Sequence, residues 1–125
     1  MNSRKTKHLI KVNIAGGNVS GCLMTPDDYA DEMFVTIPFE KFACIDLVFV
    51  APKSRRAGKG AQLIRMFIAR AKAAGAKAVV AELVQAEVII TVEERMAFFE
   101  NLGFKLFPVD EDDHDTPPLL MIAEI

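Results

Sequence analysis

One segment constrains the fold more than any other: an apolar strand that runs into a basic turn and then a helix. The apolar run Ala43–Val50 predicts a buried strand, and from Gly58 onward apolar residues recur at helical spacing. A helix start carries unpaired backbone N–H groups and the positive end of the helix dipole. With Arg55, Arg56 and Lys59 beside it, this turn predicts a binding site for phosphate oxygens.

The rest of the chain alternates between strand and helix patterns. A helix should start at Pro26, with Thr25 as its N-cap, and end near Met33. A second should start at the capping-box residues Thr91 to Glu94 and end at Gly103. The long helix that begins at Gly58 should reach about Ala74. Strands are predicted at Leu9–Ile14, Val19–Met24, Phe34–Ile37, Ala78–Val84, Phe104–Val109 and Leu119–Glu124.

Composition limits the class of protein. With 125 residues, 51% hydrophobic and 26% charged, the chain predicts a single globular domain spanning residues 1–125. A net charge of -2 gives no field to attract nucleic acid. Cys22 and Cys44 are too few for a disulfide scaffold, so we expect small buried residues in a reduced compartment. No apolar run suits a signal peptide or a membrane span, so we expect a cytoplasmic protein.

Two motifs carry a resemblance to a known family. Arg55-Arg56-Ala57-Gly58-Lys59-Gly60 resembles the coenzyme A pyrophosphate loop of the GNAT superfamily, Arg/Gln-x-x-Gly-x-Gly/Ala. Downstream, Ala97 to Phe104 is similar to the family helix that ends in Tyr-Glu-Lys-x-Gly-Phe. The resemblance covers residues 42–108 well and the first forty poorly. It implies an α/β (α+β) fold, with helices around a mixed central sheet whose central strands splay apart. The N-terminal helical region is reduced, so the acceptor pocket should be open or completed by a partner subunit.

The resemblance also implies acetyl-coenzyme A (acetyl-CoA) as cosubstrate. Backbone N–H groups from Arg56 to Gly60 would bind its pyrophosphate, and the strand Leu47–Val50 would pair with its pantetheine arm. Phe98 and Phe99 would pack against that arm and the core. The expected cofactor-binding residues are therefore Leu47, Val48, Phe49, Val50, Arg55, Arg56, Ala57, Gly58, Lys59, Gly60, Phe98 and Phe99.

Asp46 is the expected catalytic residue, because it is a carboxylate inside an apolar strand. Apolar neighbours would raise its pKa toward the range useful for a general base. It also matches the strand position of a catalytic glutamate in some protein-lysine acetyltransferases of the superfamily. The alternative is a strand-end aspartate that is exposed or paired with an arginine. Phe99 stands where many members place a tyrosine that protonates the leaving thiolate, and the asparagine that many members carry is absent from Thr91 to Glu94.

These features imply an N-acetyltransferase in which a primary amine attacks acetyl-CoA directly. The alternative is a GNAT-fold protein that binds coenzyme A or a protein partner without catalysis. The acceptor would be a small-molecule or protein amine, and a cationic one would suit the acidic clusters around Tyr29 and from Asp110 to Asp115. We favour solvated charge for those clusters and a surface position for Tyr29. His114 has no partner at metal-ligand spacing, so no metal is expected. An apolar edge at Leu119–Glu124 would allow a homodimer.

Overall fold

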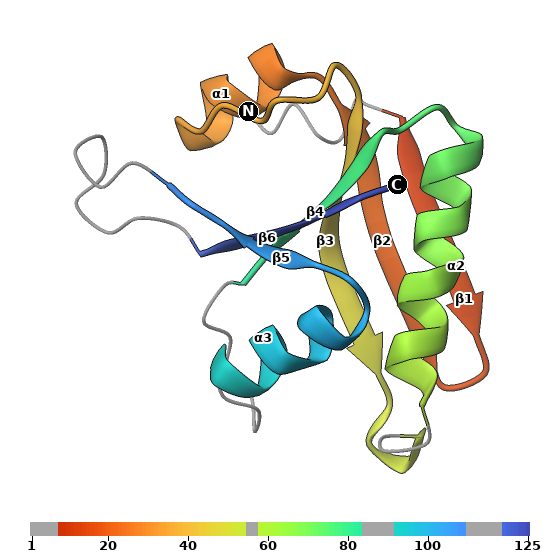
Figure 1. Cartoon of the computed structure of the whole chain (residues 1–125). Coiled ribbons are helices and arrows are strands. Elements are labelled where there is room, and N and C mark those ends of the chain that lie inside the picture. Colours follow the sequence, from red (N-terminus) through yellow and green to blue (C-terminus); the bar gives the residue numbers. More distant parts are fainter. Residues whose placement is uncertain (1–7, 55–57, 84–91, 110–118) are drawn as a thin grey trace.

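A six-stranded sheet in the order β1-β2-β3-β4-β6-β5 forms the centre of the molecule (Figure 1). The structure is a computed structural model, described for residues 8–54, 58–83, 92–109 and 119–125. Neighbouring strands are antiparallel except β3 and β4, which run parallel. The strands are β1 (Leu9–Ile14), β2 (Gly17–Met24), β3 (Phe42–Val50), β4 (Ala78–Glu82), β5 (Lys105–Phe107) and β6 (Leu120–Glu124). This mixed sheet confirms the predicted fold class.

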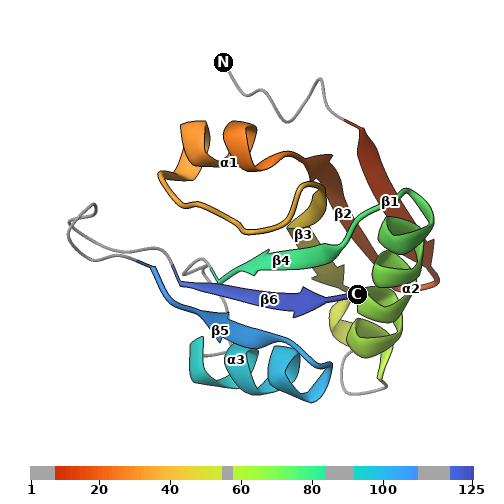
Figure 2. The same cartoon turned by 45° about the horizontal axis from the view of Figure 1, so that its top comes forward.

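Within the described residues, three α-helices and one short 3-10 helix connect the strands. They are α1 (Pro26–Met33), the 3-10 helix η2 (Pro52–Ser54), α2 (Lys59–Ala73) and α3 (Val92–Asn101). Figure 2 shows α2 alongside β1 and β2, α3 alongside β5, and α1 beyond the opposite side of the sheet. The predicted apolar face of α2 is confirmed, because Leu63, Ile64, Phe67 and Ala71 are all buried.

The core has two parts, one on each face of the sheet. Beneath α2 and α3, Leu63, Phe67, Phe99 and Phe104 pack with strand residues such as Ile45. Beneath α1, the second cluster is built from Tyr29, Phe42, Cys44, Val80 and Leu120, among others. Because strand side chains alternate between faces, neighbours such as Cys44 and Ile45 belong to different clusters.

The N-cap of α1 provides a direct test of the helix start. The Thr25 side chain accepts a hydrogen bond from the backbone N–H of Asp28 at 3.3 Å. We expect Thr25→Ala to lower the free energy of unfolding by about 1 kcal/mol, because that N–H loses its partner inside the protein. Thr25→Ser keeps the hydroxyl and is the matched control. Urea denaturation of the three proteins measures the effect, and equal stability of Thr25→Ala and wild type would contradict the role of the cap.

Two expectations from the sequence are wrong. Residues 34–37 form no strand, although Val35 and Ile37 are buried and their neighbours are exposed. Phe34 instead ends α1 in the left-handed conformation, with φ of 57°. The alternating pattern therefore reflects packing of an irregular segment over the α1 cluster. The predicted apolar edge at Leu119–Glu124 is also wrong, because β6 lies between β4 and β5. Because β6 has a neighbouring strand on each side, the argument for a homodimer through that strand no longer holds.

Candidate active site

The two central strands separate halfway along the sheet. Among the described residues, β3 pairs with β4 only from Ala43 to Ile45, opposite Val79 to Ala81. Figure 1 shows the two strands diverging from this point. Beyond it β3 keeps its partner β2, while β4 continues with β6. The predicted splay is confirmed, and it creates a strand edge in the middle of the sheet.

Side chains along this inner edge are exposed although the strand is central. The exposed fractions are 54% for Leu47, 37% for Val48 and 46% for Phe49. A strand whose neighbour has turned away offers backbone donors and acceptors on that side. Apolar side chains next to such an edge suit a flexible arm that carries amide groups and methylenes, which is the chemistry of the pantetheine arm. Leu47, Val48, Phe49 and Val50 lie on β3 at this edge, and their contact with the pantetheine arm stays a prediction.

Asp46 occupies an irregularity in β3 at the point of separation. Ile45 lies opposite Gly21 and Leu47 lies opposite Ser20, so Asp46 is the extra residue of a β-bulge. Gly21 allows the close approach, because a Cβ there would overlap the carbonyl oxygen of Cys44. Asp46 is exposed, so the burial on which the general-base argument relied is absent. The bulge nevertheless sets Asp46 beside the opening.

The start of α2 lies at the far end of the same strand. Gly58 is the N-cap, with φ of 75° and no side-chain capping bond, and a Cβ there would meet no atom of the described residues within 4 Å. Within the described part of the chain, the N-cap is therefore uncrowded, as phosphate binding to the first N–H groups of the helix requires. Lys59 donates through Nζ to the carbonyl oxygen of Ala15 at 2.9 Å. Its charge lies close to the helix start, but its side chain is held toward the β1–β2 turn.

Phe98 and Phe99 take different positions from each other. Phe99 is buried and makes edge-to-face contacts with Phe98 and Phe104, with ring centroids 5.2 and 5.1 Å apart. Phe98 is half-buried, and its ring would lie 3.3 Å from a Cβ added at Gly60. Phe98 therefore closes the space between α3 and the first turn of α2, while Phe99 belongs to the core.

The structure also reveals a carboxylate that sequence reasoning missed. Glu82 follows Ala81, the last residue of β4 paired with β3, so it stands at the separation point on β4 as Asp46, which follows Ile45, does on β3. Its Oε2 accepts hydrogen bonds from the Tyr29 hydroxyl at 2.9 Å and from the Cys44 thiol at 3.2 Å. Tyr29 is fully buried, so the predicted surface position is wrong. The available signal was that Glu82 interrupts an apolar run, as Asp46 does.

Several predicted site residues lie outside the described part of the chain. Arg55, Arg56 and Ala57 of the basic turn are among them, as are Thr91, His114 and the acidic run Asp110 to Asp115. Cys22 and Cys44 are described, and both are buried thiols, as expected. In the described ranges, no helix has both the length and the apolar character needed to cross a membrane.

The geometry defines the class of protein: a mixed α/β domain with splayed central strands and a glycine-containing helix start after the inner strand. The family model for the acetyltransferase (GNAT) domain matches residues 7–106. The chain therefore belongs to the GNAT acetyltransferase family, as the two motifs predicted. No curated protein matches it significantly in sequence.

Solved structures support the same fold. The anti-CRISPR protein AcrVA5 superposes with a TM-score of 0.65 at 21% identity, over 92% of this chain and 97% of that chain. Naa20 from Chaetomium thermophilum, solved with a bisubstrate analogue, gives 0.63 at 26% identity over 88% of this chain and 60% of that chain. The PaiA N-acetyltransferase from Thermoplasma acidophilum, solved with coenzyme A, superposes with a TM-score of 0.63 at 11% identity. The match covers 98% of this chain and 65% of that chain. The chain thus spans nearly all of the first protein but less than two thirds of the other two.

Family membership identifies acetyl-CoA as the cosubstrate, as predicted. The described residues fit that molecule in two independent places. The inner edge of β3 offers backbone groups and apolar side chains for an extended arm. The N-cap Gly58 leaves the start of α2 open to phosphate oxygens. The first place begins where β3 and β4 stop pairing, and the second follows the end of β3 in the chain.

Proposed function

We propose that this protein is an N-acetyltransferase that transfers the acetyl group of acetyl-CoA to a primary amine. The observation that carries the proposal is the splay, because β3 exposes a strand edge that leads from the start of α2 to the carboxylates Asp46 and Glu82. Family membership supports acyl transfer in general. Carboxylates at the inner end of the gap favour an amine acceptor, since an ammonium must lose a proton before it can attack.

In this proposal the neutral amine attacks the thioester carbonyl directly, without an acyl-enzyme. Backbone N–H groups of β3 near the bulge polarise that carbonyl. Asp46 accepts the proton from the incoming ammonium, directly or through a water molecule. Its exposure allows exchange of that proton with solvent. Arg55, Arg56 and the N–H groups from Arg56 to Gly60 hold the pyrophosphate, while Phe98 borders the start of α2.

Asp46→Asn tests the base. We expect kcat to fall about 100-fold, within the range that general-base catalysis contributes, while the Kd for acetyl-CoA stays unchanged. Release of free thiol, followed with a panel of amines, measures turnover, and calorimetric titration with acetyl-CoA measures binding. Glu93→Gln, at an exposed residue on α3, is the control. Equal turnover of Asp46→Asn and wild type would exclude Asp46 as the base.

A second function, binding of coenzyme A without catalysis, rests on one specific observation. Phe99 is buried at 7% exposure and has no hydroxyl, so this position supplies no acid for the thiolate. Binding of acetyl-CoA with no thiol release from any amine would favour this alternative. Loss of binding in Arg56→Glu would then still assign the phosphate site.

A further inference from the structure

Glu82 is a second carboxylate at the separation point, and general-base chemistry at Asp46 gives it no role. Glu82 is half-buried at the separation of β3 and β4, and two side chains orient it. Both Tyr29 and Cys44 are neutral donors, so these bonds fix the Oε2 atom without cancelling the carboxylate charge. Their bonds to one oxygen hold the group in place, as a binding site needs.

Two observations place Glu82 on the face of the sheet away from α2. Its partners Tyr29 and Cys44 both belong to the cluster beneath α1. The preceding residue, Ala81, belongs to the α2 cluster, and side chains alternate along a strand. The opposite face at this level is covered by α2, whose Phe67 would meet a Cβ at Gly21 at 2.8 Å. Glu82 therefore lies on the α1 side of the sheet, where its side chain is half-buried.

The same face carries features that suit a cation on a flexible arm. Helix α1 has acidic residues at Asp27, Asp28, Asp31 and Glu32 and no basic residue. Leu47 and Phe49 are exposed, and strand alternation puts them on this face, because Val48 lies opposite Val19 of the α2 cluster. A methylene chain could contact these side chains while its ammonium reaches Glu82.

We infer that Glu82, oriented by Tyr29 and Cys44, binds the ammonium group of the acceptor and so selects primary amines on an aliphatic arm, as in a lysine side chain or a polyamine. The inference rests on the proposed function and names its substrate class. The ammonium first pairs with the Glu82 carboxylate and then gives one proton to Asp46. Its nitrogen lone pair forms the C–N bond, the C–S bond breaks, and the departing thiolate takes the second nitrogen proton. Asp46 returns its proton to solvent, so the products are amide, thiol and one proton.

Glu82→Gln is the main test, because glutamine keeps the size of the side chain and an oxygen for Tyr29 but loses the charge. The probes are spermidine, a lysine-containing peptide blocked at its N-terminus, and a peptide with a free α-amino group and no lysine. Loss of the charge-assisted hydrogen bond in Glu82→Gln should raise KM about 10- to 100-fold for spermidine or the lysine peptide. We expect kcat and the Kd for acetyl-CoA to stay nearly constant. Tyr29→Phe should raise the same KM by a smaller factor, about threefold.

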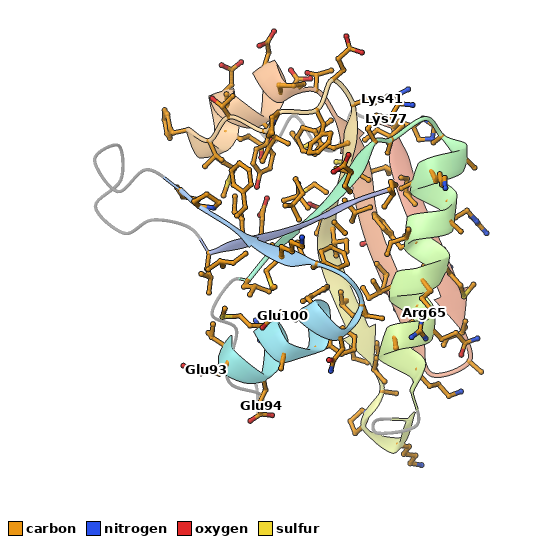
Figure 3. The ribbon with its side chains drawn as sticks, viewed as in Figure 1. Lys41, Arg65, Lys77, Glu93, Glu94 and Glu100 are labelled. Carbon is orange, nitrogen blue, oxygen red and sulfur yellow. The ribbon has the colours of Figure 1, made fainter. Side chains whose placement is uncertain are left out.

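Glu100→Gln is the matched control, since Glu100 is exposed on α3, as labelled in Figure 3. We expect this variant to leave both KM and kcat unchanged. An unchanged KM in Glu82→Gln overturns the inference, as does a loss of kcat at constant KM, which would make Glu82 a base. A lower Tm of Glu82→Gln together with weaker acetyl-CoA binding would show that Glu82 stabilises the fold, and this result would also overturn the inference.

Failure of the proposed function gives a different result. In that case the wild-type protein releases no thiol with any of the three probes. Glu82 is then judged by calorimetric titration of the coenzyme A-saturated protein with spermidine and with the lysine peptide. Binding that weakens in Glu82→Gln but not in Glu100→Gln supports the inference, while equal binding, or none by the wild type, overturns it.

Discussion

A Gly58→Asp variant is expected to bind acetyl-CoA about 100-fold more weakly than a Gly58→Asn variant, while both remain folded. The side chains have the same shape, and Asn and Asp tolerate the left-handed conformation better than most residues do. Gly58 has φ of 75°, and a Cβ there meets no atom of the described residues within 4 Å, so we expect both residues to be tolerated in the free protein. The two variants therefore differ in charge alone.

The magnitude follows from Coulomb's law. Two like charges about 5 Å apart interact with about 3 kcal/mol at an effective dielectric constant of about 20. A pyrophosphate bound at the start of α2 would meet this repulsion from an aspartate at position 58. Surface charges are screened by salt, so the difference should shrink between about 0.1 M and about 1 M ionic strength.

Calorimetric titration of both variants with acetyl-CoA at the two salt concentrations measures the effect, with melting temperatures as the check on folding. Equal affinity of the Asp and Asn variants would show that the pyrophosphate does not bind at this helix start. Weak binding by both variants, with no dependence on salt, would mean that a side chain at position 58 blocks the approach sterically. That result would contradict the electrostatic part of the argument.

The second large effect concerns the bulge. Gly21→Ala is expected to destabilise the protein by about 3 kcal/mol, because overpacking against a backbone cannot be relieved by a rotamer change. The added Cβ would overlap the carbonyl oxygen of Cys44 and would lie 2.8 Å from the Phe67 ring. Relief requires β2 to move away from β3 or α2 to lift from the sheet. A domain of this size should lose about 10 °C in Tm.

Gly103→Ala is the control for this substitution, because it separates crowding from backbone strain. Gly103 has φ of 94°, and a Cβ there would meet nothing within 4 Å. Its cost should be limited to the left-handed conformation, about 1 to 2 kcal/mol. Urea denaturation of both variants compares the cost of crowding at position 21 with the cost of backbone strain at position 103. A Gly21→Ala protein as stable as Gly103→Ala would show that the sheet can open at the bulge at little cost.

Local pattern explains which elements could be predicted from the sequence. Helix α2 was predicted from its period, and α1 was predicted to start at Pro26 and end at Met33 from its cap and first turn. Strand β3 was predicted from its apolar run. Each of these signals lies within one element. Residues 34–37 show the limit, because alternation also occurs where a chain packs on a core without a neighbouring strand.

The separation of β3 from β4 was expected only through the resemblance to the family. Neither strand carries a local signal for it, since Leu47, Val48 and Phe49 look like core residues and are exposed. Their exposure depends on where β4 leaves, which is set by pairing with β6 from the far end of the chain. The same long-range pairing placed β6 inside the sheet and removed the predicted dimer edge.

The sequence by itself determined the strand and the helix on either side of the basic turn, because the residues of each are contiguous and their backbone geometry is local. It also determined the family, through two motifs that each lie within one segment. Only the tertiary structure decided that Tyr29 is buried against Glu82, across a separation of 53 residues. Contacts of this kind depend on strand order and on which face each side chain takes, and those follow from the packing of the whole sheet.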